Sequence, residues 1–188
     1  SATTNHVSRF SIDQTTGALG TEVVAFPQFA SVMPRAIAVD PTGQFLYVAN
    51  NGDNTVSAYL IASADGSLTV IGSPVPVAPE LGPVSLSADP LGKFLYVANA
   101  TSGSVSAFLI NPATGDLSVI PSPVPATSPQ TITVDLSGQF VYVASGTLSN
   151  NVSAYAINQS TGGLSAVGSP FPISAGTNPS AITTVGRF

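Results

Sequence analysis

Two residues that could transfer a proton or bind an anion lie near the beginning of the sequence. His6 is the only histidine, and Arg35 is one of four basic residues in the chain. A histidine can act as a general base toward water, and an arginine can bind a carboxylate or phosphate through paired hydrogen bonds. We therefore take His6 and Arg35 as candidate catalytic residues. The favoured interpretation of His6 is nevertheless a solvated histidine in a loop.

A second set of candidates consists of three aspartates that recur along the chain. Asp40, Asp89 and Asp135 each end a short apolar run and precede a glycine three residues later. Three carboxylates at equivalent positions of a repeated fold could surround a metal ion. An aspartate in front of a turn glycine more commonly accepts backbone N–H hydrogen bonds. We therefore expect turn-forming aspartates, and we predict no metal site and no cofactor.

The composition excludes several classes of function. Charged residues make up 7% of the chain, and nine acidic residues against four basic ones give a net charge of −5. Binding of a nucleic-acid backbone needs clustered lysine or arginine, which this chain lacks. Cysteine is absent, so disulfides and cysteine-bound metals are excluded. No apolar run approaches the roughly 18 residues needed to cross a membrane, so we expect no membrane span.

One pattern recurs along the chain. The phrase FLYVANN at 45–51 returns as FLYVANA at 94–100 and as FVYVASG at 140–146. Each copy follows an apolar run that ends in aspartate. It precedes VSAYLI, VSAFLI or VSAYAI, and then LTVIGSPVP, LSVIPSPVP or LSAVGSPFP. We name these segments a, b, c and d in chain order. Their β-branched and aromatic residues, bounded by Gly, Pro, Asn and Asp, are typical of short strands.

Segment b is apolar on both of its faces, with Phe45 and Tyr47 on one side and Leu46 and Val48 on the other. Such strands belong to sheets that are covered on both sides. Four antiparallel strands in a repeat of 46 to 49 residues predict an all-β fold, a β-propeller of four-stranded blades. We expect the recurring tyrosines and phenylalanines to pack between blades, not to stack on a ligand.

The predicted blades divide the chain into five parts within one propeller domain. Residues 1–33 hold segments c and d of a split blade, and residues 179–188 hold segment a of the closing blade. The complete blades are 34–82, 83–128 and 129–178. Segment b of the split blade is missing. Two explanations stay open: the chain belongs to a larger ring, or separate copies complete one another through exposed strand edges.

The motifs resemble those of a known family. The pattern D-P-x-G-x-F-x-Y-V-A-N, followed by V-S-A-Y-x-I and T-G-x-L, resembles the YVTN-repeat, lactonase-type β-propellers. That family includes 6-phosphogluconolactonase-like enzymes and many bacterial and archaeal surface or secreted proteins. The resemblance extends over essentially the whole chain. It implies a seven-bladed ring, of which the chain resembles slightly more than half, and a location that is secreted or at the cell surface.

The propeller arrangement predicts which side chains share a face. The b–c loops and d–a connections of a propeller meet at one face, where ligands usually bind. His6, Asn50 and Asp53 fall in or beside b–c loops, whereas Arg35 and Glu80 fall in d–a connections. We take Asn50, Asp53 and Glu80 as candidate ligand-binding residues. Because the other units have uncharged residues at the position of Arg35, no ring of basic residues is expected: Val84, Gln130 and Ser180.

The sequence favours a noncatalytic function, because its blades are nearly identical and no acid, base and cation cluster in it. We expect an extracytoplasmic propeller that serves as a surface, structural or protein-interaction module. Self-assembly by strand complementation applies if separate copies complete one another. The partners of this module would be other copies of the chain or a cell-surface protein. The alternative, implied by the resemblance, is a 6-phosphogluconolactonase-type hydrolase of sugar lactones. A carbohydrate or small-ligand binder that uses the loops of the ligand face is a third hypothesis.

Overall fold

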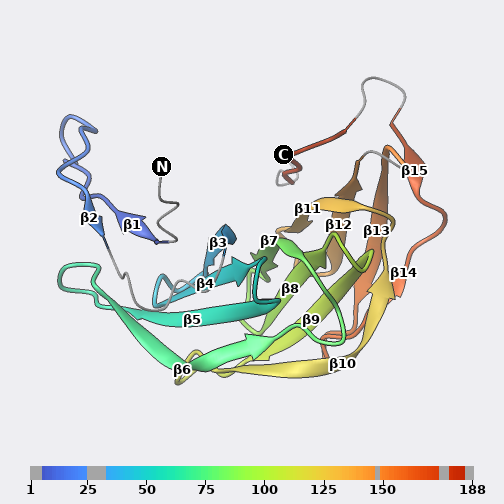
Figure 1. Cartoon of the computed structure of the whole chain (residues 1–188), viewed down its shortest axis with the longest axis horizontal. Helices are drawn as coiled ribbons and strands as arrows, with labels where there is room; N and C mark the ends of the chain where they lie inside the picture. The colour runs from blue at the N-terminus through green and yellow to red at the C-terminus, as the bar shows by residue number, and fades with distance from the viewer. Residues whose placement is uncertain (1–5, 25–32, 147–148, 174–177, 185–188) are drawn as a thin grey trace.

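The computed structural model describes residues 6–24, 33–146, 149–173 and 178–184, and these residues form strands, turns and loops without a helix. The strands make three large antiparallel sheets and one two-stranded sheet. Figure 1 shows the sheets following one another around an open arc. The fold is therefore the all-β propeller arrangement that the repeats predict.

The three large sheets follow the order of the chain, and we call them blades 1, 2 and 3. Blade 1 contains β3 (Pro34–Val39), β4 (Phe45–Asn50), β5 (Thr55–Ile61) and β6 (Leu68–Pro76). Blade 2 contains β7 (Pro83–Ala88), β8 (Phe94–Asn99), β9 (Ser104–Ile110) and β10 (Leu117–Pro125). Blade 3 contains β11 (Pro129–Val134), β12 (Phe140–Ser145), β13 (Asn151–Ile157), β14 (Leu164–Ala166) and β15 (Phe171–Pro172).

The order of strands within each blade sets the inside and the outside of the arc. The first strands, β3, β7 and β11, lie along its inner side, and β6, β10 and β14 lie on its outside (Figure 1). The inner strands contact one another, since β7 meets both β3 and β11. Residues at the start of these inner strands therefore lie where a propeller has the mouth of its central channel.

The beginning of the chain forms a smaller sheet. It consists of β1 (Ser8–Arg9) and β2 (Val23–Val24), extended by a bridge between Ile12 and Leu19. These strands occupy segments c and d of the predicted split blade. We call residues 6–24 the half blade, because no described strand takes the places of segments a and b.

Residues 178–184, expected to be a strand, form no regular secondary structure in the described part of the chain. They nevertheless begin as the inner strands do. Asn178 has a φ of 65°, and the residues before the corresponding prolines also have positive φ values: Met33 (61°), Gly82 (71°) and Ser128 (48°). The Thr184 hydroxyl donates to the Val134 carbonyl over 3.3 Å. The segment thus lies beside β11 without a segment b to pair with, so no ladder forms.

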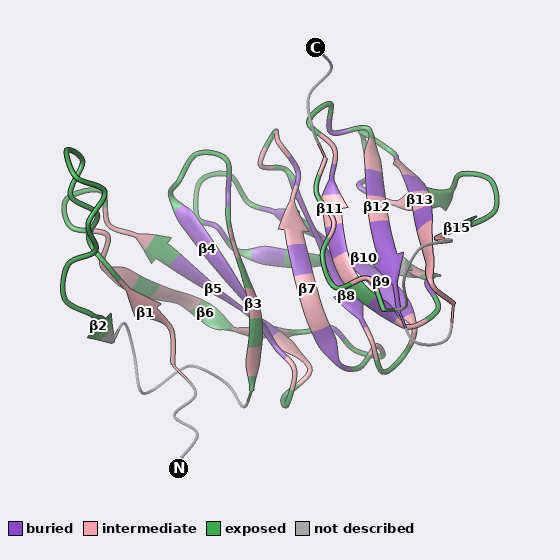
Figure 2. Cartoon of the chain, turned by 90° about the horizontal axis from the view of Figure 1, so that it is seen from above, coloured by how far each residue is buried: buried purple, intermediate pink, exposed green. Residues whose placement is uncertain are grey.

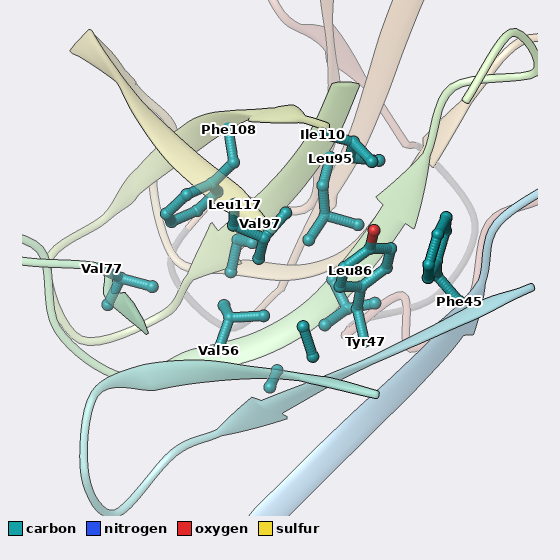
Figure 3. Close-up of a cluster of buried hydrophobic side chains, with 12 residues drawn as sticks. Phe45, Tyr47, Val56, Val77, Leu86, Leu95, Val97, Phe108, Ile110 and Leu117 are labelled. Carbon is teal, nitrogen blue, oxygen red and sulfur yellow. The ribbon is translucent and has the colours of Figure 1, made fainter. Parts of the chain in front are cut away.

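The core lies between successive blades. We call the face of a blade that packs on the preceding blade its front and the opposite face its back. The back of blade 1 meets the front of blade 2 in one cluster (Figure 3), which includes Phe45, Tyr47, Val56, Leu95, Val97 and Phe108. The back of blade 2 meets the front of blade 3 in a second cluster, which includes Phe94, Tyr96, Val105, Val141, Val143 and Tyr155. The recurring aromatic residues of blades 1 and 2 pack between blades, as predicted, whereas Phe140 and Tyr142 of blade 3 are only half-buried. Figure 2 shows buried residues along β4 and β12 and none among the described residues of the half blade.

The three recurring aspartates form turns, as expected. Asp40 accepts hydrogen bonds from the N–H groups of Phe45 (2.7 Å) and Thr42 (3.0 Å). Asp89 and Asp135 accept the corresponding bonds from Phe94 (2.7 Å) and Phe140 (2.8 Å). Each carboxylate thereby fixes the start of the following strand b, which is the phrase that recurs.

Candidate functional site

A depression lies between the half blade and the start of β3. It has a volume of about 290 Å³, and it is lined by His6, Val7, Ser8, Pro34, Arg35, Ala36 and Ile37. The structure therefore brings together the two candidate catalytic residues, which are separated by most of the half blade in sequence. His6 stands just before β1, and Arg35 is the second residue of β3.

Glu22 completes a polar cluster around His6. Its Oε1 lies 3.7 Å from His6 Nε2, and the His6 side chain is 28% exposed. The Ser8 hydroxyl donates a hydrogen bond to the same carboxylate oxygen. Glu22 thus lies beside the imidazole, at a separation longer than a hydrogen bond.

Sequence reasoning did not name Glu22, although the repeat contains a signal for it. The corresponding positions of segment d hold apolar residues: Ile71, Ile120 and Val167. Likewise, the position of His6 holds Thr55, Ser104 and Asn151 in the complete blades. The residues that could do chemistry are therefore the ones by which the half blade departs from the repeat.

Arg35 presents the cation of this depression. It is exposed on the inner strand β3, and it makes no ion pair with another residue that the structure describes. A guanidinium placed in this way can bind a carboxylate or polarise a carbonyl group. The other arginine of this region has a structural position: Arg9 NH1 donates to the Asp65 carbonyl, and NH2 lies 3.9 Å from the Asp65 carboxylate.

None of the three candidate ligand-binding residues lines this depression, although Asn50 pairs with Pro34 at its edge. Asn50 is fully buried, and its Nδ2 donates to the hydroxyls of Thr55 (3.1 Å) and Ser57 (2.9 Å). Asp53 is exposed in the loop between β4 and β5. Glu80 is half-buried and accepts a hydrogen bond from the Ser104 hydroxyl. Asn50 and Glu80 thus bond to neighbouring strands, and the structure does not bring the three together with His6 and Arg35.

The sequence matches the model of the lactonase family, which is described as a seven-bladed β-propeller, over residues 2–86 and 80–178. The chain belongs to this family. The repeats of this lactonase propeller account for both the phrase FLYVANN and the succession of blades. No curated protein sequence matches the chain.

Solved structures share the fold of this lactonase propeller. A candidate 6-phosphogluconolactonase from Bacteroides uniformis superimposes with a TM-score of 0.79 at 20% identity, over 94% of this chain and 54% of that one. A periplasmic gluconolactonase from Pseudomonas aeruginosa gives a TM-score of 0.77 at 22% identity, over 93% and 52% of the two chains. A protein from Lactobacillus plantarum gives 0.74 at 21% identity, over 94% and 50%. The chain thus spans about half the length of these structures.

The described part of the lactonase propeller contains no group of three or more His, Asp or Glu side chains that could hold a metal ion. Nor does any helix in the described ranges have the length and apolar character of a membrane span. The depression offers the His6 imidazole and the Arg35 guanidinium, and the Glu22 carboxylate lies beside the imidazole. These groups suit proton transfer and the binding of an anionic or developing anionic oxygen.

Proposed function

We propose that this chain forms part of a propeller that hydrolyses a sugar lactone, and that His6, Glu22 and Arg35 belong to its active site. One observation carries the proposal. In a chain with a single histidine and four basic residues, His6 and Arg35 line one depression, and a glutamate adjoins the imidazole. All three residues replace uncharged residues of the repeat.

The proposed reaction follows from the roles of these groups. His6 takes a proton from a water molecule, whose oxygen attacks the lactone carbonyl carbon. The Arg35 guanidinium donates hydrogen bonds to the carbonyl oxygen as it becomes negatively charged. The ring C–O bond then breaks, and the protonated His6 returns its proton to the leaving alkoxide. The product is the open-chain hydroxy acid, and no oxidant or cofactor is consumed.

Glu22 has a positioning role in this scheme. Its carboxylate faces His6 Nε2, so it stabilises the imidazolium that forms when water is deprotonated. The Ser8 hydroxyl donates a hydrogen bond to the same carboxylate oxygen and helps to fix its position. A base that is oriented by a third group is a recurrent arrangement in enzymes that activate a nucleophile.

The comparisons support this proposal more than a noncatalytic module. The family model is that of lactonases, and the printed names of two similar structures describe gluconolactonase-type proteins. Because the chain spans about half of those structures, we propose that further residues of the site come from additional blades. The periplasmic neighbour also supports a location outside the cytoplasm for this protein.

The proposal is tested by lactone hydrolysis with the longest natural form of the protein. Glucono-δ-lactone and 6-phosphogluconolactone are the substrates, and acid release is followed with a pH indicator after subtraction of spontaneous hydrolysis. We expect His6→Ala to lower kcat/KM by roughly 10²- to 10⁴-fold, as for loss of a general base. Arg35→Ala should also reduce it, and Glu22→Gln should reduce kcat more than it changes KM.

Lys93→Ala is the matched control, because Lys93 is an exposed cation in the turn before β8, remote from the depression. Its turnover should equal that of the unaltered protein. Absence of lactone hydrolysis, or hydrolysis that survives His6→Ala and Arg35→Ala, would refute the proposal and restore the noncatalytic interpretation of the sequence.

A further inference from the structure

The half blade exposes an apolar surface that the other blades bury. Phe10, Ile12 and Leu19 have exposed fractions of 46%, 57% and 65%. The residues at the same positions in blade 2 are Phe108, Ile110 and Leu117, with exposed fractions of 0%, 2% and 9%. In blade 2 they form part of the front face and pack against the back of blade 1.

Blade 3 repeats this arrangement, so it is a property of the repeat. Tyr155 and Ile157 occupy the positions of Phe10 and Ile12, and both are buried against the back of blade 2. The exposed surface of the half blade, which we call the open front, thus has the residue types and the pairing of a normal front. Ile12 pairs with Leu19 as Ile110 pairs with Leu117.

The other end of the arc has a complementary surface, the open back of blade 3. Phe140, Tyr142, Val152 and Ala154 are half-buried there. Their counterparts on the back of blade 1 are buried by the following blade: Phe45, Tyr47, Val56 and Ala58. Among the described residues no further blade covers this surface, which is the one that packs on a front elsewhere in the chain.

A glycine in the turn between strands c and d marks the register of each contact. A Cβ added at Gly115 would lie 2.4 Å from Phe45, and one at Gly162 would lie 2.5 Å from Phe94. Each glycine carbonyl also accepts a hydrogen bond from a tyrosine of the preceding blade, Tyr47 or Tyr96.

The half blade has the same turn glycine, but its surroundings differ. Gly17 has a φ of 72°, close to those of Gly115 and Gly162, and no atom lies within 4 Å of its Cβ position. The turn of the half blade is thus shaped to receive a phenylalanine and a tyrosine from a preceding back. On blade 3, Phe140 and Tyr142 occupy the positions of these two residues.

We propose that two copies of this chain bind head to tail, with the open back of blade 3 on the open front of the half blade. Phe140 of one copy then covers Gly17 of the second copy, and the Tyr142 hydroxyl donates to the Gly17 carbonyl. Phe10, Ile12 and Leu19 of the second copy become buried in this contact. The proposal is independent of lactone hydrolysis.

A second copy is the occupant that the geometry favours. Figure 1 shows the half blade and blade 3 at the two ends of an open arc, so the described residues of one chain do not bring these two faces together. The contact would reproduce one that the chain already makes twice between its own blades. It would also bring residues 178–184, which lie in the place of an inner strand, to the same blade as β1 and β2. Such a contact is heterologous, because each copy contributes a different face.

Light scattering after size-exclusion chromatography tests the proposal with the 188-residue chain. The unaltered chain should show a molar mass that rises with concentration above the 18.8 kDa of one copy. Ile12→Asp blocks the open front, and Ala154→Arg blocks the open back. Each variant alone should remain monomeric, whereas an equimolar mixture should form a dimer, because one intact front and one intact back remain.

The matched control is Leu91→Asp, which introduces the same charge at a residue that is 59% exposed in a turn of blade 2 and belongs to neither open face. It should associate like the unaltered chain. Circular dichroism and thermal melting establish that each variant is folded. A monomeric unaltered chain at the highest soluble concentration, or a mixture that stays monomeric, would overturn the proposal and leave these faces to further repeats of the same polypeptide. Dissociation by Leu91→Asp would overturn it as well.

Discussion

The hydroxyl of Tyr47 donates a hydrogen bond of 3.1 Å to the carbonyl oxygen of Gly115, which lies 68 residues further along the chain. Tyr96 makes the same bond, of 3.0 Å, to Gly162. Both tyrosines belong to the recurring phrase, and both glycines belong to the turn between strands c and d of the next blade. The phrase therefore carries one of the polar connections between blades as well as part of their apolar core.

Tyr47→Phe should destabilise the chain by about 0.5–1.5 kcal/mol, because it removes this bond and leaves the Gly115 carbonyl without its tyrosine donor. Urea unfolding monitored by circular dichroism measures the effect. Tyr142→Phe is the matched control when both substitutions are made in the Ile12→Asp chain, where the proposed contact between copies cannot form. In that chain the control should have almost no effect. Equal losses in the two variants would contradict the assignment of the bond.

The same tyrosines predict a loss of stability in alkaline solution. Burial, followed by the nearby Asp40 carboxylate, raises the pKa of Tyr47 well above its ordinary value of 10.0, and burial also raises the pKa of Tyr96. The unfolded chain then loses these protons at a lower pH than the folded chain. The contribution of these two protonated tyrosines to the stability of the folded chain is therefore fully present below about pH 10, and it is lost as the pH rises through their folded-state pKa values.

Melting temperatures at a series of pH values above neutrality measure this decline. The Tyr47→Phe, Tyr96→Phe double variant should be less stable at neutral pH but should lose less stability on alkalisation. An alkaline slope identical to that of the unaltered chain would show that other groups cause it.

The fold was predictable because the same pattern of four strand-like segments occurs three times in the sequence. The spacing of Asp40 and Asp89, the phrase between them and the turn glycines predict blades, and these appear as expected. The exception is 178–184, whose residues match an inner strand. A strand requires a partner as well as a suitable sequence, and no described segment supplies one.

The candidate site was only partly predictable. His6 and Arg35 were identifiable because histidine and basic residues are rare in this chain. The structure places both of them at one depression. Glu22 was missed, because only the register of the half blade shows that its carboxylate reaches His6. Asn50, in contrast, was named as a candidate ligand-binding residue although its side chain is buried. It ends a strand near a polar loop, yet hydrogen bonds to Thr55 and Ser57 draw its side chain into the blade.

Gly115→Ala should be among the most destabilising single substitutions in the turns. The added Cβ would lie 2.4 Å from a ring carbon of Phe45, and the residue has a φ of 75°, which L-residues with a side chain rarely adopt. Gly43→Ala is the control, because Gly43 has a φ of 73° with no atom within 4 Å of the Cβ position. Backbone strain is then common to both variants.

The difference between the two glycine variants isolates the contact with the preceding blade. We expect Gly115→Ala to lose about 1–3 kcal/mol more than Gly43→Ala, a range typical of overpacking in a core. Equal losses in urea unfolding would mean that the blades separate easily at this turn, contrary to the close packing of Phe45.

Asp40→Asn should lower the free energy of unfolding at neutral pH, and it should make that free energy less sensitive to a fall in pH. Burial raises the pKa of Asp40, but hydrogen bonds from Thr42, Phe45 and Gln44 outweigh it and hold the pKa below the ordinary value of 3.8. The ionised carboxylate therefore stabilises the folded chain above that pH, and the contribution is lost as the pH falls through the folded pKa. The amide keeps the shape of the side chain but accepts hydrogen bonds without a charge, so we expect a loss of about 1–3 kcal/mol at neutral pH. Urea unfolding at neutral pH and at a series of values below pH 4 measures the free energy of unfolding of both chains. The difference between the variant and the unaltered chain should shrink as the pH falls. A difference that stays constant would assign the acid sensitivity to other carboxylates.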